Sequence, residues 1–358
     1  MQGQIPQRAC YIVTRIAILT ESRADWGIYL PLLEAMQADS RFELMLLVTG
    51  SQTMQQIRVD GFDGYVLYWP VIGALYALPR PDWFIVLGDR RPMLEAAIEA
   101  AYRNIPVAHI QGGDRTGTID DPCRHAITRF ANLHFPCTQQ SADRLIRMGE
   151  EPWRIKVVGP LGIYAMGDAT LLSKAKICQK LGLSAEREIV LVIQHPVSTQ
   201  VAQAGEQMKQ TLAAVKGWQT VVIYPNSDSG SEAMIEVIKG CEWVRSFRSL
   251  PYLEFVSLLR AASVIVGNSS TGLYEAPLFG VPAVNIGIRQ NLRERALNII
   301  DCGPEVGQIQ IALRWQLGHR TRRHDNPFDV NVDGVNVILE ILAETVIDER
   351  LLQKRLTY

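Results

Sequence analysis

Acidic residues follow two short apolar runs in the first half of the chain. Asp89 comes soon after Phe84–Leu87, and a loop that contains Asp120 follows Val107–Ile110. If both runs are neighbouring strands, these carboxyl groups lie at the carboxyl ends of the strands, where they can take up or release a proton during catalysis. One aspartate in such a position is commonly a helix cap, but two loops that each combine glycine with aspartate favour a catalytic site.

Similar loops follow the apolar runs of the second half. His195 stands just after Ile189–Ile193 and is followed by Pro196, which places its ring to meet a ligand, although a single histidine is more often structural. The turns 225–231 and 267–272 lead into helices, and the unpaired N–H groups and hydroxyls of such turns can bind phosphate without any lysine. Neither turn has the spacing of a P-loop or of a dinucleotide-binding glycine motif, so the sequence supports neither a P-loop NTPase nor a nicotinamide enzyme.

Three single residues add to these loops. Arg23 follows the first apolar run and could reach an anion at the N-terminus of a helix that Ser22 caps. His125 lies in the opening turn of a helix, where it either serves catalysis or bonds to buried backbone groups. Glu275 lies one turn inside the helix after residues 267–272, within reach of ribose hydroxyls if a nucleotide binds there.

The elements that must position these residues alternate along the chain. Short runs rich in Leu and β-branched residues are separated mostly by helical patterns, such as 140–148 and 170–181. The runs are 15–20, 44–48, 84–87, 107–110, 133–136, 155–158, 189–193, 220–224, 243–246, 264–267 and 283–286. Strands that alternate with helices predict parallel sheets that are covered on both faces.

A cluster of breakers, Gly159, Pro160 and Gly162, interrupts this alternation near the middle of the chain. The length of 358 residues also suits two domains of about 150 residues each. We therefore predict an α/β protein with two Rossmann-like, doubly wound parallel-sheet domains that face a cleft. The first domain would span residues 1–165 and the second 166–345.

Composition excludes several classes of protein. Lys and Arg number 36 against 37 Asp and Glu, so no global basic field exists to hold nucleic acid or an anionic membrane. The chain is 47% hydrophobic and 20% charged, which excludes intrinsic disorder. Its six cysteines form no C-x-x-C pair, which argues against a zinc cage or a disulfide framework. Reduced thiols, with no signal-peptide core and no membrane-spanning run, predict a cytoplasmic protein.

Short motifs occur in a fixed order along the chain: SRADWG at 22–27, GDR at 88–90, GG at 112–113, TIDD at 118–121, RHAIT at 124–128, HPVST at 195–199, GNSS at 267–270, EAP at 275–277, FGVP at 279–282 and NIGIRQ at 285–290. Taken in order, these motifs resemble those of the hydrolysing UDP-N-acetylglucosamine 2-epimerases. The resemblance runs from about residue 15 to residue 301. It implies a glycosyltransferase-B-like fold, in which a last helix, here over 346–358, rejoins the first domain.

The family reaction implied by this resemblance removes the C2 proton of the sugar and expels UDP to leave a glycal. Water then adds to give a free sugar of the manno configuration, and no metal or redox cofactor is required. The implied partners are a UDP-sugar substrate and a second copy of the chain. The implied product is a mannosamine-type precursor for sialic or legionaminic acid synthesis.

The resemblance also implies roles for individual residues. Asp89, Asp120 and His195 fall on catalytic positions, with the carboxyl groups in proton transfer and His195 at the leaving phosphate. Gln111 and His125 are further candidates on the catalytic side. The nucleotide-contacting positions are Arg23, Asn226, Asp228, Ser269, Ser270 and Glu275, with the serines at the diphosphate and Glu275 at the ribose.

Two departures from the family lie on the catalytic side. The family commonly has histidine where this chain has Gln52, and glutamate or histidine where it has Gln111. Glutamine can hydrogen-bond but cannot exchange a proton near neutral pH. The segment 50–88 is also shorter than in relatives, and its apolar stretch 65–71 is compatible with a subunit interface. The sequence therefore leaves three hypotheses: a hydrolysing 2-epimerase acting on UDP-N-acetylglucosamine or a UDP-diacetamido sugar, a catalytically impaired UDP-sugar-binding protein, and a glycosyltransferase of the same fold.

Overall fold

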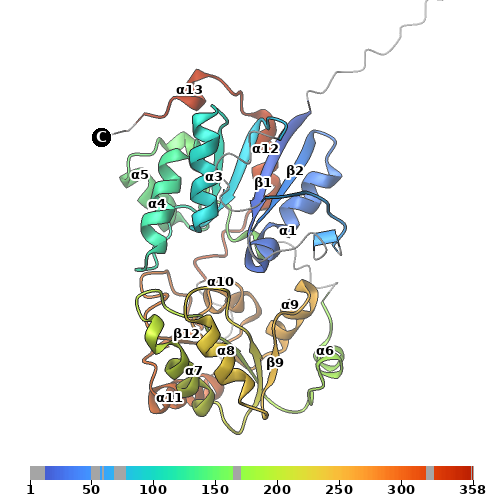
Figure 1. The fold of residues 1–358 in the computed structure, drawn as a ribbon, viewed down its shortest axis with the longest axis vertical. Helices are drawn as coiled ribbons and strands as arrows, with labels where there is room; N and C mark the ends of the chain where they lie inside the picture. The colour runs from blue at the N-terminus through green and yellow to red at the C-terminus, as the bar shows by residue number, and fades with distance from the viewer. Residues whose placement is uncertain are drawn as a thin grey trace, which may run out of the picture.

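The computed structural model describes residues 13–49, 57–58, 60–67, 78–163, 171–319, 326–355 and 357. Within these residues the chain forms two sheets of six strands each, one above the other along the long axis of the molecule, and helices flank both (Figure 1). All paired strands are parallel. The predicted architecture of two doubly wound α/β domains is therefore confirmed.

The first domain is built on a sheet with the strand order β3-β2-β1-β4-β5-β6. Its strands are β1 (Thr14–Thr20), β2 (Phe42–Val48), β3 (Tyr65–Val66), β4 (Trp83–Leu87), β5 (Val107–Ile110) and β6 (Leu133–Phe135). Its helices are α1 (Arg23–Ala38), α3 (Arg91–Tyr102), α4 (Asp120–Phe130) and α5 (Gln139–Arg147), with short 3-10 turns at Pro152–Arg154 and Leu161–Ile163. Alternate residues of β1 serve the two faces: Ile16 and Ile18 join the core beneath α1, whereas Ala17 and Leu19 join the core beneath α3.

The second domain repeats this plan with the strand order β12-β11-β10-β7-β8-β9. Its strands are β7 (Ile189–Ile193), β8 (Gln219–Ile223), β9 (Arg245–Phe247), β10 (Val264–Gly267), β11 (Ala283–Ile286) and β12 (Ile299–Cys302). Its helices are α6 (Lys174–Leu181), α7 (Ala204–Ala214), α8 (Ser231–Lys239), α9 (Tyr252–Ala261), α10 (Thr271–Tyr274) and α11 (Val306–Gly318), with 3-10 turns at Val201–Gln203 and Ala276–Phe279.

The chain returns to the first domain near its C-terminus. Helix α12 (Gly334–Glu344) contributes Val335, Ile338, Leu339 and Leu342 to the core that contains α1, and both α12 and the four-residue α13 (Glu349–Leu352) lie with the first domain (Figure 1). Asn132 Nδ2 and Arg154 Nη1 both donate to the carbonyl oxygen of Leu351, each at 2.9 Å. The expected division at 345/346 does not match this packing, because α12 already covers the first domain.

One predicted strand is wrong. Of the run 155–158, Ile155 makes a single isolated bridge to His134. The neighbouring β6 ends before Pro136, and proline has no N–H with which to continue a ladder.

Two expectations concern residues that lie wholly or partly outside the described chain. Gln52 lies outside the described residues, as does most of the stretch 65–71. Its first residues, Tyr65 and Val66, form the exposed edge strand β3.

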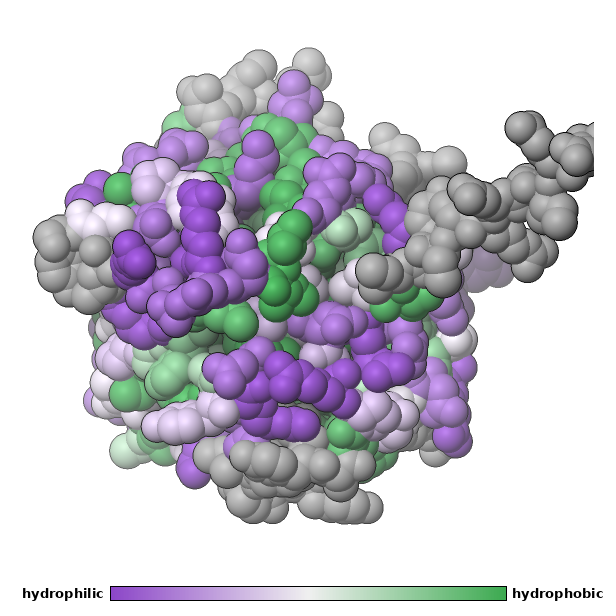
Figure 2. Space-filling model, turned by 90° about the horizontal axis from the view of Figure 1, so that it is seen from above, coloured by the Kyte–Doolittle hydropathy of each residue, from purple (hydrophilic) through white to green (hydrophobic). Residues whose placement is uncertain are grey.

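Seen from above, hydrophilic residues divide the apolar ones into small patches on the end of the molecule formed by the first domain (Figure 2). No helix of the described chain is long and apolar enough to span a membrane.

Each sheet has a switch point at which the winding direction of the chain reverses. It lies between β1 and β4 in the first sheet and between β7 and β10 in the second. In open α/β sheets ligands bind in the crevice beyond the carboxyl ends of the strands at such points. Arg90, after β4, lies 3.8 Å from the carboxylate of Asp228, after β8, so loops from the two domains meet in this region.

Candidate active site

His195 follows β7 at the switch point of the second domain. Its backbone N–H donates to Asn268 Oδ1 at 2.7 Å, and Asn268 Nδ2 donates back to its carbonyl oxygen at 2.9 Å. The backbone N–H of Asn226 donates to Nδ1 of the ring at 3.1 Å. Because Nδ1 accepts a hydrogen bond, the neutral ring carries its proton on Nε2. Burial lowers the pKa of His195 well below its usual range, helped by the charges of Arg289 and Arg90, so the ring is a neutral N–H donor.

The predicted diphosphate residues lie directly after Asn268. Gly267 has a φ of +138°, and a Cβ there would overlap the carbonyl oxygen of Ile193, so only glycine lets β10 end this close to β7. Ser269 donates its backbone N–H to that same carbonyl at 3.3 Å, and Ser270 precedes α10. Both serines therefore lie at the same strand ends as His195.

Glu275 directly follows the short helix α10. Its Oε2 is buried and has no hydrogen-bond partner among the described residues. Burial raises the pKa of this carboxyl group to about 7. An oxygen with this environment can accept hydrogen bonds from a polar ligand such as a ribose.

Asn226 and Asp228 form a pair in the loop after β8. Asn226 Nδ2 donates to Asp228 Oδ2 at 2.7 Å, and Asp228 Oδ1 faces Arg90 of the first domain. Arg23 begins α1 of the first domain, and its side chain is outside the described atoms.

In the first domain Asp89 follows β4 and pairs with Arg124 of α4. The Arg124 side chain is only 1% exposed, and its other terminal nitrogen donates to Asp121 Oδ1 at 2.7 Å and to the carbonyl oxygen of Asp114 at 3.0 Å. Burial raises the pKa of Asp89, but the positive charges of Arg124 and Arg293 outweigh it and lower the pKa below its usual range. Asp89 is therefore held ionised.

Asp120 shows the opposite behaviour. Burial, followed by the negative charge of Asp89, raises its pKa. Thr118 Oγ1 donates to Asp120 Oδ2 at 2.9 Å and fixes the carboxyl group at the start of α4. Two carboxyl groups whose pKa values are moved apart in one site are suited to act as a base and an acid.

Gln111 and His125 flank this pair. Gln111 has a φ of +62° and donates its backbone N–H to Phe135 at 3.0 Å, which turns the chain sharply after β5. His125 is half-buried on α4, and its Nδ1 has no hydrogen-bond partner among the described residues. Burial and the charge of Arg124 lower its pKa, so its ring is neutral at neutral pH. By contrast, His109 and His134 are fully buried.

Sequence reasoning missed three arginines of the site, Arg90, Arg289 and Arg293. Arg289 donates to the carbonyl oxygen of Asn268 at 3.3 Å. Burial lowers the pKa of Arg289, and the negative charge of Asp120 opposes this most strongly. Arg90 and Arg293 add two further cations. The signal was present, because Arg90 and Arg289 lie inside the motifs at 88–90 and 285–290. Within the described chain no three His, Cys, Asp or Glu side chains gather as ligands for a metal ion.

Comparison with known proteins identifies the family. The family model described as UDP-N-acetylglucosamine 2-epimerase matches residues 71–341. A hydrolysing UDP-N,N'-diacetylbacillosamine 2-epimerase of Legionella pneumophila is 32% identical over 348 residues, which cover 88% of this chain and 92% of that protein. A UDP-N-acetylglucosamine 2-epimerase of Neisseria meningitidis is 30% identical over 327 residues, which cover 84% of this chain and 86% of that protein.

A solved structure shows the same fold. The UDP-N-acetylglucosamine 2-epimerase of Methanocaldococcus jannaschii, in complex with UDP-N-acetylglucosamine and UDP, matches with a TM-score of 0.77 at 16% identity. The match covers 93% of this chain and all of that one. With a family model that spans most of the chain and relatives that are similar over nearly their whole length, the chain belongs to the UDP-N-acetylglucosamine 2-epimerase family.

Proposed function

We propose that this protein is a hydrolysing 2-epimerase. It converts UDP-N-acetylglucosamine, or a UDP-diacetamido sugar, to UDP and a free N-acetylmannosamine-type sugar. The observation that carries this proposal is the pair Asp89 and Asp120, one with a lowered and one with a raised pKa, beside the cations of the cleft. Family membership and the Legionella relative, a hydrolysing enzyme by its name, support the same reaction.

In this mechanism the ionised Asp89 takes the proton from C2 while the C1–O bond to UDP breaks, which leaves a glycal. The departing diphosphate receives hydrogen bonds from His195 Nε2–H, from Ser269 and Ser270, and charge compensation from Arg289. Water then adds its hydroxyl to C1, and the protonated Asp120 supplies a proton to C2 from the other face. The remaining proton of the water passes to Asp120, and Asp89 releases the proton taken from C2 to solvent, which restores both carboxyl groups. The balance is one UDP-sugar and one water consumed, and one UDP and one free sugar formed.

The nucleotide would lie against the second domain. Glu275, with its unpaired buried oxygen, is proposed to accept hydrogen bonds from the ribose. Asn226, Asp228 and Arg23 complete the proposed contacts to UDP. Gln111 cannot transfer a proton, so this mechanism assigns both proton transfers to the two aspartates and leaves Gln111 and His125 to bind the sugar.

We further propose a cytoplasmic homodimer that supplies a precursor for sialic or legionaminic acid synthesis. The five described cysteines are free thiols, as in a reducing compartment. The exposed edge strand β3 is a candidate subunit surface. The diacetamido sugar in the name of the Legionella relative supports the pathway.

The test is incubation of the purified protein with UDP-N-acetylglucosamine and, separately, with UDP-N,N'-diacetylbacillosamine in deuterated water. UDP release and a free manno sugar with deuterium at C2, followed by NMR, are the expected result. Asp89→Asn should lower kcat by roughly 10²- to 10⁴-fold, the range typical for a general base, whereas Asp143→Asn on α5 should not. Bound UDP without turnover would favour the impaired binding protein, and transfer of a labelled sugar to an acceptor would favour a glycosyltransferase.

A further inference from the structure

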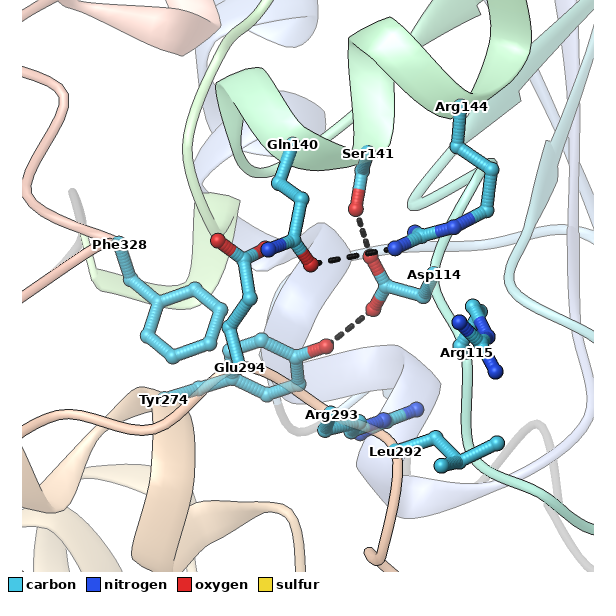
Figure 3. A pocket seen from close by; sticks show the side chains of 10 residues that line it. All are labelled: Asp114, Arg115, Gln140, Ser141, Arg144, Tyr274, Leu292, Arg293, Glu294 and Phe328. Carbon is cyan, nitrogen blue, oxygen red and sulfur yellow. Dashed lines mark hydrogen bonds between the residues drawn. The ribbon is translucent and has the colours of Figure 1, made fainter. Parts of the chain in front are cut away.

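A hydrogen bond between the two domains starts next to the proposed ribose-binding residue. Tyr274 is the last residue of α10 and precedes Glu275. Its hydroxyl donates to Asp114 Oδ2 in the loop after β5 of the first domain. Tyr274 is 4% and Asp114 5% exposed, so solvent has almost no access to this bond. Figure 3 shows the two side chains pointing toward each other across a small polar pocket.

The ring of Tyr274 packs against Arg293, which follows β11, and against Phe328, which lies between α11 and α12. Phe328 packs edge-on against it with ring centroids 4.4 Å apart, and the guanidinium of Arg293 lies 5.0 Å from the ring centroid. Burial raises the pKa of the phenol well above its usual range, so the hydroxyl remains a donor. The position of this hydroxyl therefore follows the position of α10.

Asp114 forms hydrogen bonds with two helices of the first domain, α5 and α4. Its Oδ1 accepts from Ser141 Oγ at 2.8 Å, which ties it to α5. Its carbonyl oxygen accepts from Arg124 Nη1 at 3.0 Å, and Arg124 Nη2 pairs with Asp89. Two residues, Asp114 and Arg124, thus connect the Tyr274 hydroxyl to the proposed catalytic base.

The residues on both sides of α10 belong to the proposed nucleotide site. Ser269 and Ser270 precede the helix and Glu275 follows it, so these three residues and Tyr274 belong to one short segment. A nucleotide bound by this segment fixes the place of the tyrosine hydroxyl as well.

We propose that Tyr274 is a positioning residue that couples nucleotide binding in the second domain to the placement of Asp89 in the first. This inference rests on the proposed function, because it takes UDP as the ligand of α10 and Asp89 as the base. The coupling runs from the UDP contacts of α10 through the Tyr274 hydroxyl to Asp114, Arg124 and Asp89. The nucleotide therefore helps to orient the catalytic carboxylate without touching it.

Hydrogen exchange measured with UDP alone tests the coupling without any turnover. In the wild-type protein, saturating UDP should slow amide exchange in segment 267–275, which binds it, and also in segment 111–121 of the other domain. Tyr274→Phe keeps the ring against Phe328 and removes one oxygen. In this variant UDP should still protect 267–275, but its protection of 111–121 should be lost.

Tyr252→Phe is the matched control. Its hydroxyl also crosses between the domains, from α9 to the carbonyl oxygen of Gly162 at 2.6 Å, but it does not contact Asp114 or Arg124. The control should keep the protection of 111–121. Loss of protection in both variants, or in neither, would overturn the proposal.

Turnover gives the second measurement. Hydrogen bonds to charged groups are among the stronger ones, so Tyr274→Phe should lower kcat roughly 10-fold or more while the Kd for UDP changes less than about 3-fold. Asp114→Asn should give a similar loss, and the double variant should lose little more than either single one. Additive losses, or a weakened Kd with unchanged kcat, would contradict the coupling. A wild-type protein that binds no UDP would overturn the proposed function first, before any variant is compared.

Discussion

At the scale of single residues, the guanidinium of Arg124 lies between the carboxylates of Asp89 and Asp121. Its charge lowers the pKa of Asp89, and the ionised Asp89 in turn raises the pKa of Asp120. Arg293 adds to the effect of Arg124 on Asp89, and burial is the larger cause of the raised pKa of Asp120, so these influences together divide the pair into a base and an acid. Because the two groups interact, their titration belongs to the pair.

Replacing Arg124 with lysine should shift the pH dependence of the reaction. Lysine cannot make the same forked contact with Asp89 and Asp121, so the pKa of Asp89 should rise. A higher pKa leaves less of the base ionised at acidic pH, and the acid limb of the kcat/KM profile should move to higher pH. Arg129→Lys, on the same helix but paired with Glu150, is the control. An acid limb that stays in place would show that Arg124 does not set the charge of the base.

The ring of His195 should be neutral, with its proton on Nε2. The N–H of Asn226 occupies Nδ1, and burial lowers the pKa, so acidification to pH 6.5 should not protonate this ring. Nitrogen-15 NMR of labelled histidines distinguishes the two tautomers and the cation, and the His195→Gln spectrum assigns the signal. A proton on Nδ1, or a charged ring at neutral pH, would contradict the proposed donor to the diphosphate.

At the scale of elements, the strands that sequence predicted best are buried apolar runs ended by turn residues. The bounds of β5, β7, β10 and β11 match the predicted runs. The edge strands β3 and β12 were missed, since β3 has two residues and β12 is only partly buried. Among the described residues of the predicted C-terminal helix, only α13 is helical. This segment is bound to the first domain by hydrogen bonds from distant residues such as Arg154, which no local pattern reveals.

The close approach of the C-terminal ends of β10 and β7 depends on Gly267. Gly267→Ala adds a Cβ that would overlap the carbonyl oxygen of Ile193, at a φ of +138° that L side chains rarely adopt. We expect a loss of about 2 to 4 kcal/mol in the free energy of unfolding, measured by urea titration. UDP binding should weaken as well, because Asn268 and Ser269 follow this glycine.

Gly307→Ala is the control for this substitution. Gly307 lies on α11, where an added Cβ meets nothing within 4 Å, so the protein should keep its stability or gain up to about 1 kcal/mol. Equal stability of the two variants would show that the close approach at Gly267 is not required.

At the scale of the whole molecule, the contacts that complete the site join residues far apart in sequence. Tyr274 and Asp114 are 160 positions apart, and Arg90 meets Asp228 across the cleft. Asp120 is the first residue of α4, but the sequence pattern correctly placed Asp89 and His195 just after strands, here β4 and β7. It could not pair these residues across the domains, because sequence spacing carries no information on how two separately wound sheets approach each other.

The return of the chain to its first domain leads to a prediction about folding. Four side chains of α12, those of Val335, Ile338, Leu339 and Leu342, are buried in the core beneath α1. At about 1.5 to 3 kcal/mol for each buried side chain, they contribute on the order of 6 to 12 kcal/mol, as much as the whole stability of a typical domain. Residues 1–163 alone should therefore lack a cooperative unfolding transition.

The same residues should fold once α12 is restored. Gly334 lies so close to Val158 that a Cβ would overlap its carbonyl oxygen, so α12 begins beside the first domain. A flexible glycine-serine linker can therefore join residue 163 to the segment 326–333 that leads into α12. We expect the joined chain, 1–163 with 326–358, to unfold cooperatively in urea when followed by circular dichroism. The same chain with Ile338→Asp should behave like 1–163 alone. Burying an unpaired charge in this core costs more free energy than the packing of α12 contributes. A cooperative transition in 1–163 without α12 would mean that the first domain is complete without the returning chain, and that α12 serves only to hold the two domains together.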